Sequence, residues 1–226
     1  MQDDDNREST ATATWSRMLA GNRRFAEGTA EHPWQDRETR ESLLDRQTPD
    51  AAVLACSDSR VPPEIIFDAG LGDLFTIRNA GQVIDDATLG SLEYAVTKLH
   101  VSLIVVLGHE SCGAISMAAD AVDMMSGNLI HKADDAMTVE NEIDNLAERI
   151  MEMDSVIIRQ AGISVWQARE AELENTDDYE RVHIAHTIEE LVTRSDIVQD
   201  ALANNQLMIV GARYQMKSGI VEVLSF

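Results

Sequence analysis

The stretch AAVLACSDSR, residues 51–60, ends an apolar run with three reactive side chains on alternate residues, Cys56, Asp58 and Arg60. Side chains of an extended strand alternate between its two faces. If the extended geometry continues past residue 55, these three side chains project to one side. Open α/β sheets carry their chemistry at the carboxyl ends of their strands. The stretch therefore predicts a buried strand that leads directly into a functional site.

A second apolar run, VSLIVVLGH at residues 101–109, has the same design and is followed at once by ESCG. A continuous run of this kind is typical of a parallel strand that is covered on both faces. Neighbouring parallel strands end at the same edge of a sheet, so we expect His109 and Cys112 to meet Cys56 and Asp58 there. Cys112 also falls in the first turn of a helix predicted at residues 111–125, where the helix dipole favours a thiolate.

Two cysteines and a histidine form a zinc ligand set, which leaves a fourth position for Asp58 or water. Three protein ligands and one exchangeable ligand are typical of a catalytic zinc site. The alternatives are two inert buried cysteines, a redox dithiol and a structural zinc site. The absence of a C-x-x-C spacing weighs against the dithiol, and the nearby pair of Asp58 and Arg60 weighs against a structural site. The sequence also lacks the motifs of nicotinamide-dependent zinc dehydrogenases, nucleobase deaminases and H-E-x-x-H proteases.

Strand-like and helix-like segments alternate along the rest of the chain, which predicts an α/β fold in a single domain of residues 1–226. We expect a mostly parallel central β-sheet flanked by helices, an antiparallel edge strand and an N-terminal helical arm, with residues 1–12 as a flexible tail. The periodicity places strands at 51–56, 74–81, 101–109, 207–215 and 220–226, the last two joined as a hairpin. It places helices at 15–28, 37–46, within 62–72, 87–99, 111–125, 139–174 with a break near Gly162, and 179–204, and a loop at 127–135.

Composition narrows the class of protein. The net charge of −22 excludes a nucleic-acid-binding protein of the usual basic kind. No apolar run approaches the roughly 20 residues that a membrane span needs. The acidic start MQDDDNREST does not resemble a secretory signal, so we expect a cytoplasmic protein. The acidity fits either adaptation to a salty cytoplasm or an ordinary acidic enzyme.

Together, C-x-D-x-R and H-x-x-C about fifty residues later resemble the β-class carbonic anhydrases. EIIFDAGLGDLF, IRNAG, GSLEYAV and IVVLGHESCGA strengthen the resemblance, which covers residues 22–116 and resumes at 206–223. It implies that Cys56, His109 and Cys112 bind Zn²⁺, and that Asp58 and Arg60 form a catalytic dyad in which Asp58 lies either on zinc or on Arg60. The implied reaction is the reversible hydration of CO₂ to bicarbonate. Hydrolysis of carbonyl sulfide or carbon disulfide and a non-enzymatic zinc-stabilised scaffold are the alternatives.

The resemblance also implies surroundings for this centre. Phe75, Ala80 and Tyr94 would surround the small substrate, partly across a dimer interface, and the helix around Trp15 would wrap a partner subunit. The expected assembly is a homodimer or a dimer of dimers.

One departure concerns regulation. The tryptophan that precedes the first cysteine in members with a noncatalytic bicarbonate pocket is missing from AAVLA. Although Arg78 and Tyr214 match that pocket, we therefore do not expect bicarbonate regulation. Outside these motifs, His183 and His186 stand three residues apart on one predicted helix. We interpret them as a solvated helix face rather than as a second metal site.

Overall fold

The computed structural model describes residues 2–132 and 145–225, excluding the side chains of 2–9 and 128–132. Within these residues, one five-stranded sheet has the order β2-β1-β3-β4-β5. The first four strands are parallel, and β5 runs antiparallel to β4 at the edge. This confirms the predicted fold class. The strands are β1 (Ala51–Cys56), β2 (Leu74–Asn79), β3 (Leu103–His109), β4 (Met208–Tyr214) and β5 (Val221–Ser225).

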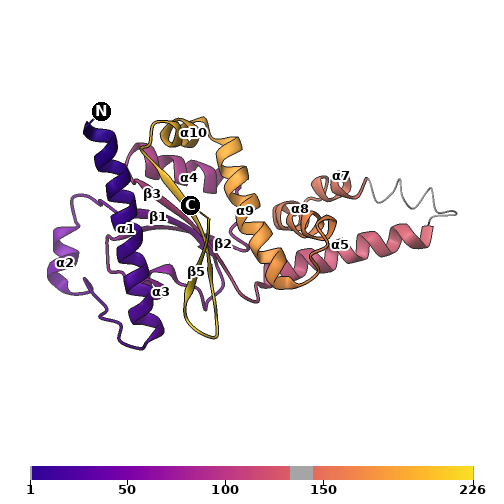
Figure 1. Cartoon of the computed structure of the whole chain (residues 1–226), viewed down its shortest axis with the longest axis horizontal. Coiled ribbons are helices and arrows are strands. Elements are labelled where there is room, and N and C mark those ends of the chain that lie inside the picture. Colours follow the sequence, from indigo (N-terminus) through magenta and orange to yellow (C-terminus); the bar gives the residue numbers. More distant parts are fainter. Residues whose placement is uncertain (1, 133–144, 226) are drawn as a thin grey trace.

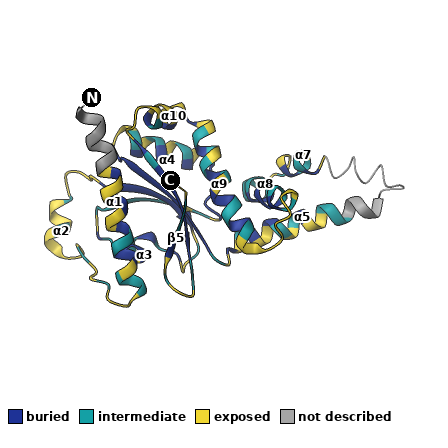
Figure 2. Ribbon diagram, in the orientation of Figure 1, coloured by how far each residue is buried: buried dark blue, intermediate teal, exposed yellow. Residues whose placement is uncertain are grey.

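Helices cover both faces of the sheet, and the central strands are therefore buried along their whole length (Figures 1 and 2). Apolar side chains of α1 and of the α3 segment pack on one face, and those of α4, α9 and α10 pack on the other. Figure 1 shows α5, α7 and α8 beyond one end of the sheet. The helices are α1 (Gln2–Ala26), α2 (Arg37–Ser42), α3 (Pro63–Ile66), α4 (Asp86–Thr97), α5 (Gly113–Lys132), α7 (Leu146–Met151), α8 (Val156–Glu170), α9 (Thr176–Arg194) and α10 (Asp196–Ala203).

The N-terminal arm begins earlier than the sequence pattern predicts. Helix α1 starts at Gln2, so the segment expected to be a flexible tail is helical, and Ala11 is buried. Trp15 is buried in the core of its own chain, where its ring meets Phe67 edge-on at 6.0 Å between centroids. The side-chain amide of Asn22 donates to the carbonyl groups of Ile66 and Gly219. The arm is therefore docked on its own sheet.

Three helix boundaries differ from prediction, and side-chain caps set two of them. The predicted helix 179–204 is divided at Ser195, whose hydroxyl accepts from the backbone N–H of Val198 and starts α10. The predicted break near Gly162 lies instead before α8, where the Ser155 hydroxyl accepts from the backbone N–H of Ile158. Residues 127–132, expected to form a loop, continue α5. The remainder of that predicted loop, and residues 139–144 of the predicted helix, lie outside the described residues.

Among residues 2–132 and 145–225, none of the helices combines the length and the apolar character that a membrane crossing demands.

Candidate metal centre

The three predicted metal ligands meet at the carboxyl edge of the sheet. Cys56 is the last residue of β1 and His109 the last of the neighbouring parallel strand β3, while Cys112 directly precedes α5. One ligand atom from each residue lies within 4.8 Å of the others, and all three residues are buried. The convergence expected from two parallel strands is therefore present.

The backbone of the two loops aims the cysteines at this point. Ser111 has a positive φ of 55°, which reverses the chain between β3 and α5 and returns Cys112 toward His109. The backbone N–H groups of Asp58 and Gly81 both donate to Cys56 Sγ, each at 3.4 Å. Hydrogen bonds to the charged form of an acid favour that form, so this arrangement suits a thiolate.

The histidine ring is held in the tautomer that a metal ligand requires. His109 Nδ1 lies 2.9 Å from the carbonyl oxygen of Glu110. Because a carbonyl only accepts, Nδ1 carries the proton and Nε2 presents a lone pair. Nε2 is buried and has no hydrogen-bond partner. Metal-ligating histidines commonly donate their second ring N–H to a carbonyl group, so this unpartnered nitrogen fits a zinc ligand.

The two cysteines shift each other's pKa in opposite directions. A hydrogen bond from Cys112 lowers the pKa of Cys56 to about 4, and the same bond, together with burial, raises the pKa of Cys112 well above its usual range. One thiolate therefore forms readily, and a divalent cation would favour the second. The donor set and its charge both fit Zn²⁺.

Asp58 lies beside this group and is paired with Arg60. Arg60 Nε donates to Asp58 Oδ1 at 2.9 Å, and Arg60 Nη2 donates to Oδ2 at 2.7 Å. These bonds hold the pKa of Asp58 well below its usual range, so its carboxylate stays ionised. Of the two positions expected for Asp58, the structure shows the one on Arg60.

Arg78 has a role that the sequence did not reveal. Its Nε donates to the carbonyl oxygen of Cys56 at 3.0 Å, and its Nη2 donates to that of Asp58 at 2.7 Å. Strand β2 pairs with β1 so that Asn79 lies opposite Cys56, which brings Arg78 to this loop. Arg78 thus fixes the backbone at Cys56 and Asp58.

The predicted substrate residues do not gather around the metal centre within one chain. Phe75 pairs with Ala52, four residues before Cys56, which is about 13 Å along a strand. Tyr94 lies with Phe75, at 6.0 Å between ring centroids, and is 46% exposed. Ala80, next to Gly81, is the member of this set that lies at the carboxyl edge. A contribution of Phe75 and Tyr94 across a subunit interface stays a prediction.

The interpretation of His183 as part of a solvated face is wrong. His183 is fully buried, and its ring nitrogens contact Ser164 Oγ and the carbonyl oxygen of Gly81. His186 is partly buried and 3.9 Å from Glu189. In the described part of the chain, the group able to hold a metal contains neither histidine.

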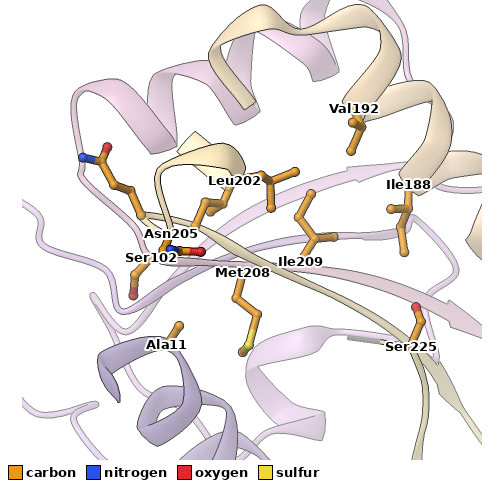
Figure 3. Close-up of a pocket in the computed structure, with 11 residues that line it drawn as sticks. Ala11, Ser102, Ile188, Val192, Leu202, Asn205, Met208, Ile209 and Ser225 are labelled. Carbon is orange, nitrogen blue, oxygen red and sulfur yellow. The ribbon is translucent and has the colours of Figure 1, made fainter. Parts of the chain in front are cut away.

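An apolar cavity of about 340 Å³ lies away from this centre (Figure 3). Ser102, Met208 and Ile209 line it from the amino ends of β3 and β4, and Ile188 and Leu202 line it from α9 and α10. Because the predicted metal ligands lie at the carboxyl ends of the strands, this cavity is at the opposite end of the strands and is separate from the candidate site.

Comparison with known proteins places the whole chain in one family. Residues 51–221 match the family model described as carbonic anhydrase. The chain is 41% identical to a carbonic anhydrase of Mycolicibacterium smegmatis over 96% of this chain and 95% of the relative, and 40% identical to carbonic anhydrase 2 of Mycobacterium tuberculosis over 92% and 89%.

Solved structures agree on the fold. The β-carbonic anhydrase CafA of Aspergillus fumigatus matches with a TM-score of 0.57 at 25% identity, over 93% of this chain and 90% of that one. A tetrameric β-carbonic anhydrase of Sordaria macrospora matches with a TM-score of 0.61 at 21% identity, over 94% and 97%. The chain therefore belongs to the β-class carbonic anhydrases, a family of enzymes.

Proposed function

We propose that the protein catalyses the reversible hydration of CO₂ to bicarbonate and a proton, with a zinc ion held by Cys56, His109 and Cys112. The observation that carries this proposal is the buried convergence of two sulfur atoms and a ring nitrogen of His109 within 4.8 Å, together with the unpartnered Nε2 of that ring. Zinc, when bound, supplies the Lewis acidity that makes water nucleophilic near neutral pH.

The protein's own residues then have separate tasks. Asp58 is ionised at neutral pH because Arg60 lowers its pKa, so its carboxylate can accept a hydrogen bond from a water molecule that is losing its proton. Arg60 fixes the direction of that carboxylate through two parallel N–H···O bonds and reaches the carbonyl oxygen of Ser111 as well. The dyad is thereby fixed to both ligand loops.

The test is a stopped-flow assay of CO₂ hydration with a zinc determination on the same sample. We expect near-stoichiometric zinc, loss of activity on chelation and recovery when zinc returns. Two thiolate ligands neutralise the charge of the ion, so activity should rise toward alkaline pH. Repeating the assay with carbonyl sulfide and carbon disulfide decides the substrate. A zinc-loaded protein that hydrates no CO₂ would overturn the proposal.

An Asp58→Asn variant tests the dyad. It keeps the shape of the side chain but removes its charge, so we expect bound zinc to be retained and turnover to fall by about 10²–10⁴-fold. Asp50→Asn is the matched control, because Asp50 also pairs with an arginine, Arg17 at 2.9 Å, but directly precedes the amino end of β1. Equal activity of the two variants would remove the dyad from the mechanism.

We also propose that the protein is a cytoplasmic homodimer or dimer of dimers. The Sordaria macrospora relatives are described as tetrameric. Strand β2 is at the edge of the sheet, and exposed Tyr94 lies next to it. Light scattering on the purified protein measures the assembly, and a monomer at micromolar concentration would contradict it.

A further inference from the structure

Helix α9 reaches both cysteine loops of the metal centre with buried polar side chains. Glu180 and His183 stand three residues apart on α9, and they are 2% and 0% exposed. Each bonds to the backbone of a different loop, Glu180 to the one that carries Cys112 and His183 to the one that donates to Cys56. Helix α9 lies outside the motifs that carry the ligands, between the sheet and the helices α5 and α8 in Figure 1.

Glu180 connects Cys112 to the sheet. Its Oε1 accepts from the backbone N–H of Cys112 at 3.1 Å. Its Oε2 accepts from Nε and Nη2 of Arg213 on β4, at 3.0 and 2.8 Å. Because Arg213 is itself 1% exposed, the carboxylate has little freedom to turn. The position of Cys112 is therefore set by a contact that runs through α9 to β4.

His183 acts on Cys56 through one peptide group. Its Nε2 lies 2.7 Å from the carbonyl oxygen of Gly81 and must donate to it. Its Nδ1 is then the acceptor and takes a hydrogen bond from Ser164 Oγ at 2.9 Å. The N–H of the same Gly81 donates to Cys56 Sγ. Gly81 has a positive φ of 80°, and a Cβ there would lie 3.0 Å from Ala114, so the loop depends on its hydrogen bonds and on glycine for this shape.

We propose that Glu180 and His183 are positioning residues that hold the two cysteine sulfurs at the separation a zinc ion needs, and thereby set the zinc affinity. The inference rests on the zinc site proposed above. Hydrogen-bond partners behind a metal ligand typically change metal affinity by about 10–100-fold when they are removed. Here the partners act through backbone groups, so side chains outside the ligand motifs control the centre.

The first experiment measures zinc affinity by competition with a chromophoric chelator. Glu180→Ala and His183→Leu remove the two hydrogen bonds, and we expect each to weaken zinc binding about 10–100-fold. Glu180→Gln keeps an oxygen acceptor for Cys112 and His183→Gln keeps an N–H donor for Gly81, so both should recover most of the affinity. Thr187→Val is the control, because Thr187 is buried one turn further along α9 and its hydroxyl donates to the carbonyl oxygen of His183, within the helix itself.

The second experiment needs neither zinc nor activity. Phenylarsine oxide binds two thiols that lie close together, so it reports the separation of Cys56 and Cys112 in metal-free protein. We expect tight capture by the wild-type protein, the Thr187→Val control and the two Gln variants, and weaker capture by Glu180→Ala and His183→Leu.

The two measurements separate the inference from the proposed function. Thermal melting identifies any variant that fails to fold. If Glu180→Ala or His183→Leu does not fold, Glu180→Gln or His183→Gln is compared with the wild-type protein instead. If Glu180→Ala and His183→Leu bind zinc and phenylarsine oxide as tightly as wild type, the inference is overturned even where their melting temperatures fall. A wild-type protein that takes up no zinc but still shows the arsenical pattern would contradict the proposed function and the claim about zinc affinity, and would support only the claim that Glu180 and His183 set the separation of the two sulfur atoms.

Discussion

Two arginine–glutamate pairs of similar geometry differ sharply in burial. Arg213 donates two hydrogen bonds to Glu180 at 2.8–3.0 Å, and these side chains are 1% and 2% exposed. Arg181 donates two to Glu222 at 2.8–3.0 Å, and these are 37% and 33% exposed. Both pairs join α9 to the last two strands. We compare Arg213→Met with Arg181→Met.

The expected losses of stability differ because only one substitution leaves a charge in the interior. Removing one partner of a buried pair costs about 3–5 kcal/mol, whereas an exposed pair contributes about 0–1 kcal/mol. With a denaturant slope of about 2 kcal/mol per molar urea, Arg213→Met should lower the unfolding midpoint by about 2 M. Arg181→Met should lower it by less than about 0.5 M.

The loss should also depend on pH with a predictable sign. Burial raises the pKa of Glu180, and Arg213 opposes that rise. Without Arg213 the folded-state pKa of Glu180 rises further above its unfolded value, so the folded variant binds a proton that the unfolded chain has lost. Stability relative to wild type is then highest below the unfolded pKa and is lost as the pH rises through the folded pKa. The deficit of Arg213→Met should therefore be smaller at pH 5 than at pH 8.

The assay is urea unfolding followed by circular dichroism, at one protein concentration and with zinc in excess, at both pH values. Fixed concentrations matter because assembly and metal binding both add to apparent stability. An Arg213→Met variant that is no less stable than Arg181→Met would refute the reasoning, and so would a deficit that grows toward acid pH.

Three further predictions concern packing, pH and metal. A Cβ on Gly21 would overlap the carbonyl oxygen of Phe67, so Gly21→Ala should lower the free energy of unfolding by about 3 kcal/mol or more. A Cβ on Gly90 would meet open space, so Gly90→Ala should stabilise α4 by roughly 0.5–1 kcal/mol. Thermal melting of the two variants compares these effects. Burial lowers the pKa of His183 to about 4, below its unfolded value. As the pH falls from 6.5 to 4, the wild-type protein should therefore lose about 3 kcal/mol of its free energy of unfolding, and His183→Gln should not show this loss. Chelation should lower the melting temperature, and added zinc should restore it.

The sheet was predictable because its strands are long apolar runs. Residues 51–56 form β1 as predicted, and residues 101–109 contain β3. Because both strands are buried on both faces, their sequences are continuous apolar runs without alternation of apolar and polar residues, which is typical of parallel strands. The parallel arrangement also made the candidate metal site predictable, because neighbouring parallel strands end at the same edge of the sheet.

Helix boundaries were harder because they depend on single polar contacts. Ser195 ends α9 and starts α10, and Ser155 starts α8, each through a side-chain cap that does not interrupt the apolar periodicity. The start of α1 is acidic and polar, so the pattern gave no amphipathic stripe before Trp15. Local sequence could not reveal these choices.

The residues that brace the site were missed for a related reason. Glu180 and His183 belong to the inward stripe of α9, which also holds Ile184, Thr187 and Leu191. A carboxylate in such a stripe is almost never buried unless it is paired. That rule was available from the sequence and indicates a partner inside the protein, but it could not name Arg213 or Cys112.

The close approach of α9 to the sheet explains how the side chains of Glu180 and His183 reach the two loops of the metal centre. A Cβ on Gly108, one residue before the ligand His109, would lie 2.5 Å from Ile184 Cδ1, and one on Gly211 would lie 3.1 Å from Ile184 Cγ2. Glycine at both positions lets Ile184 rest directly on β3 and β4. Because Ile184 follows His183 in the chain, this contact sets how closely the turn of α9 that carries Glu180 and His183 approaches the sheet. If Glu180 and His183 set the zinc affinity as proposed, that affinity also depends on glycine at positions 108 and 211, where a side chain would push α9 away from the sheet.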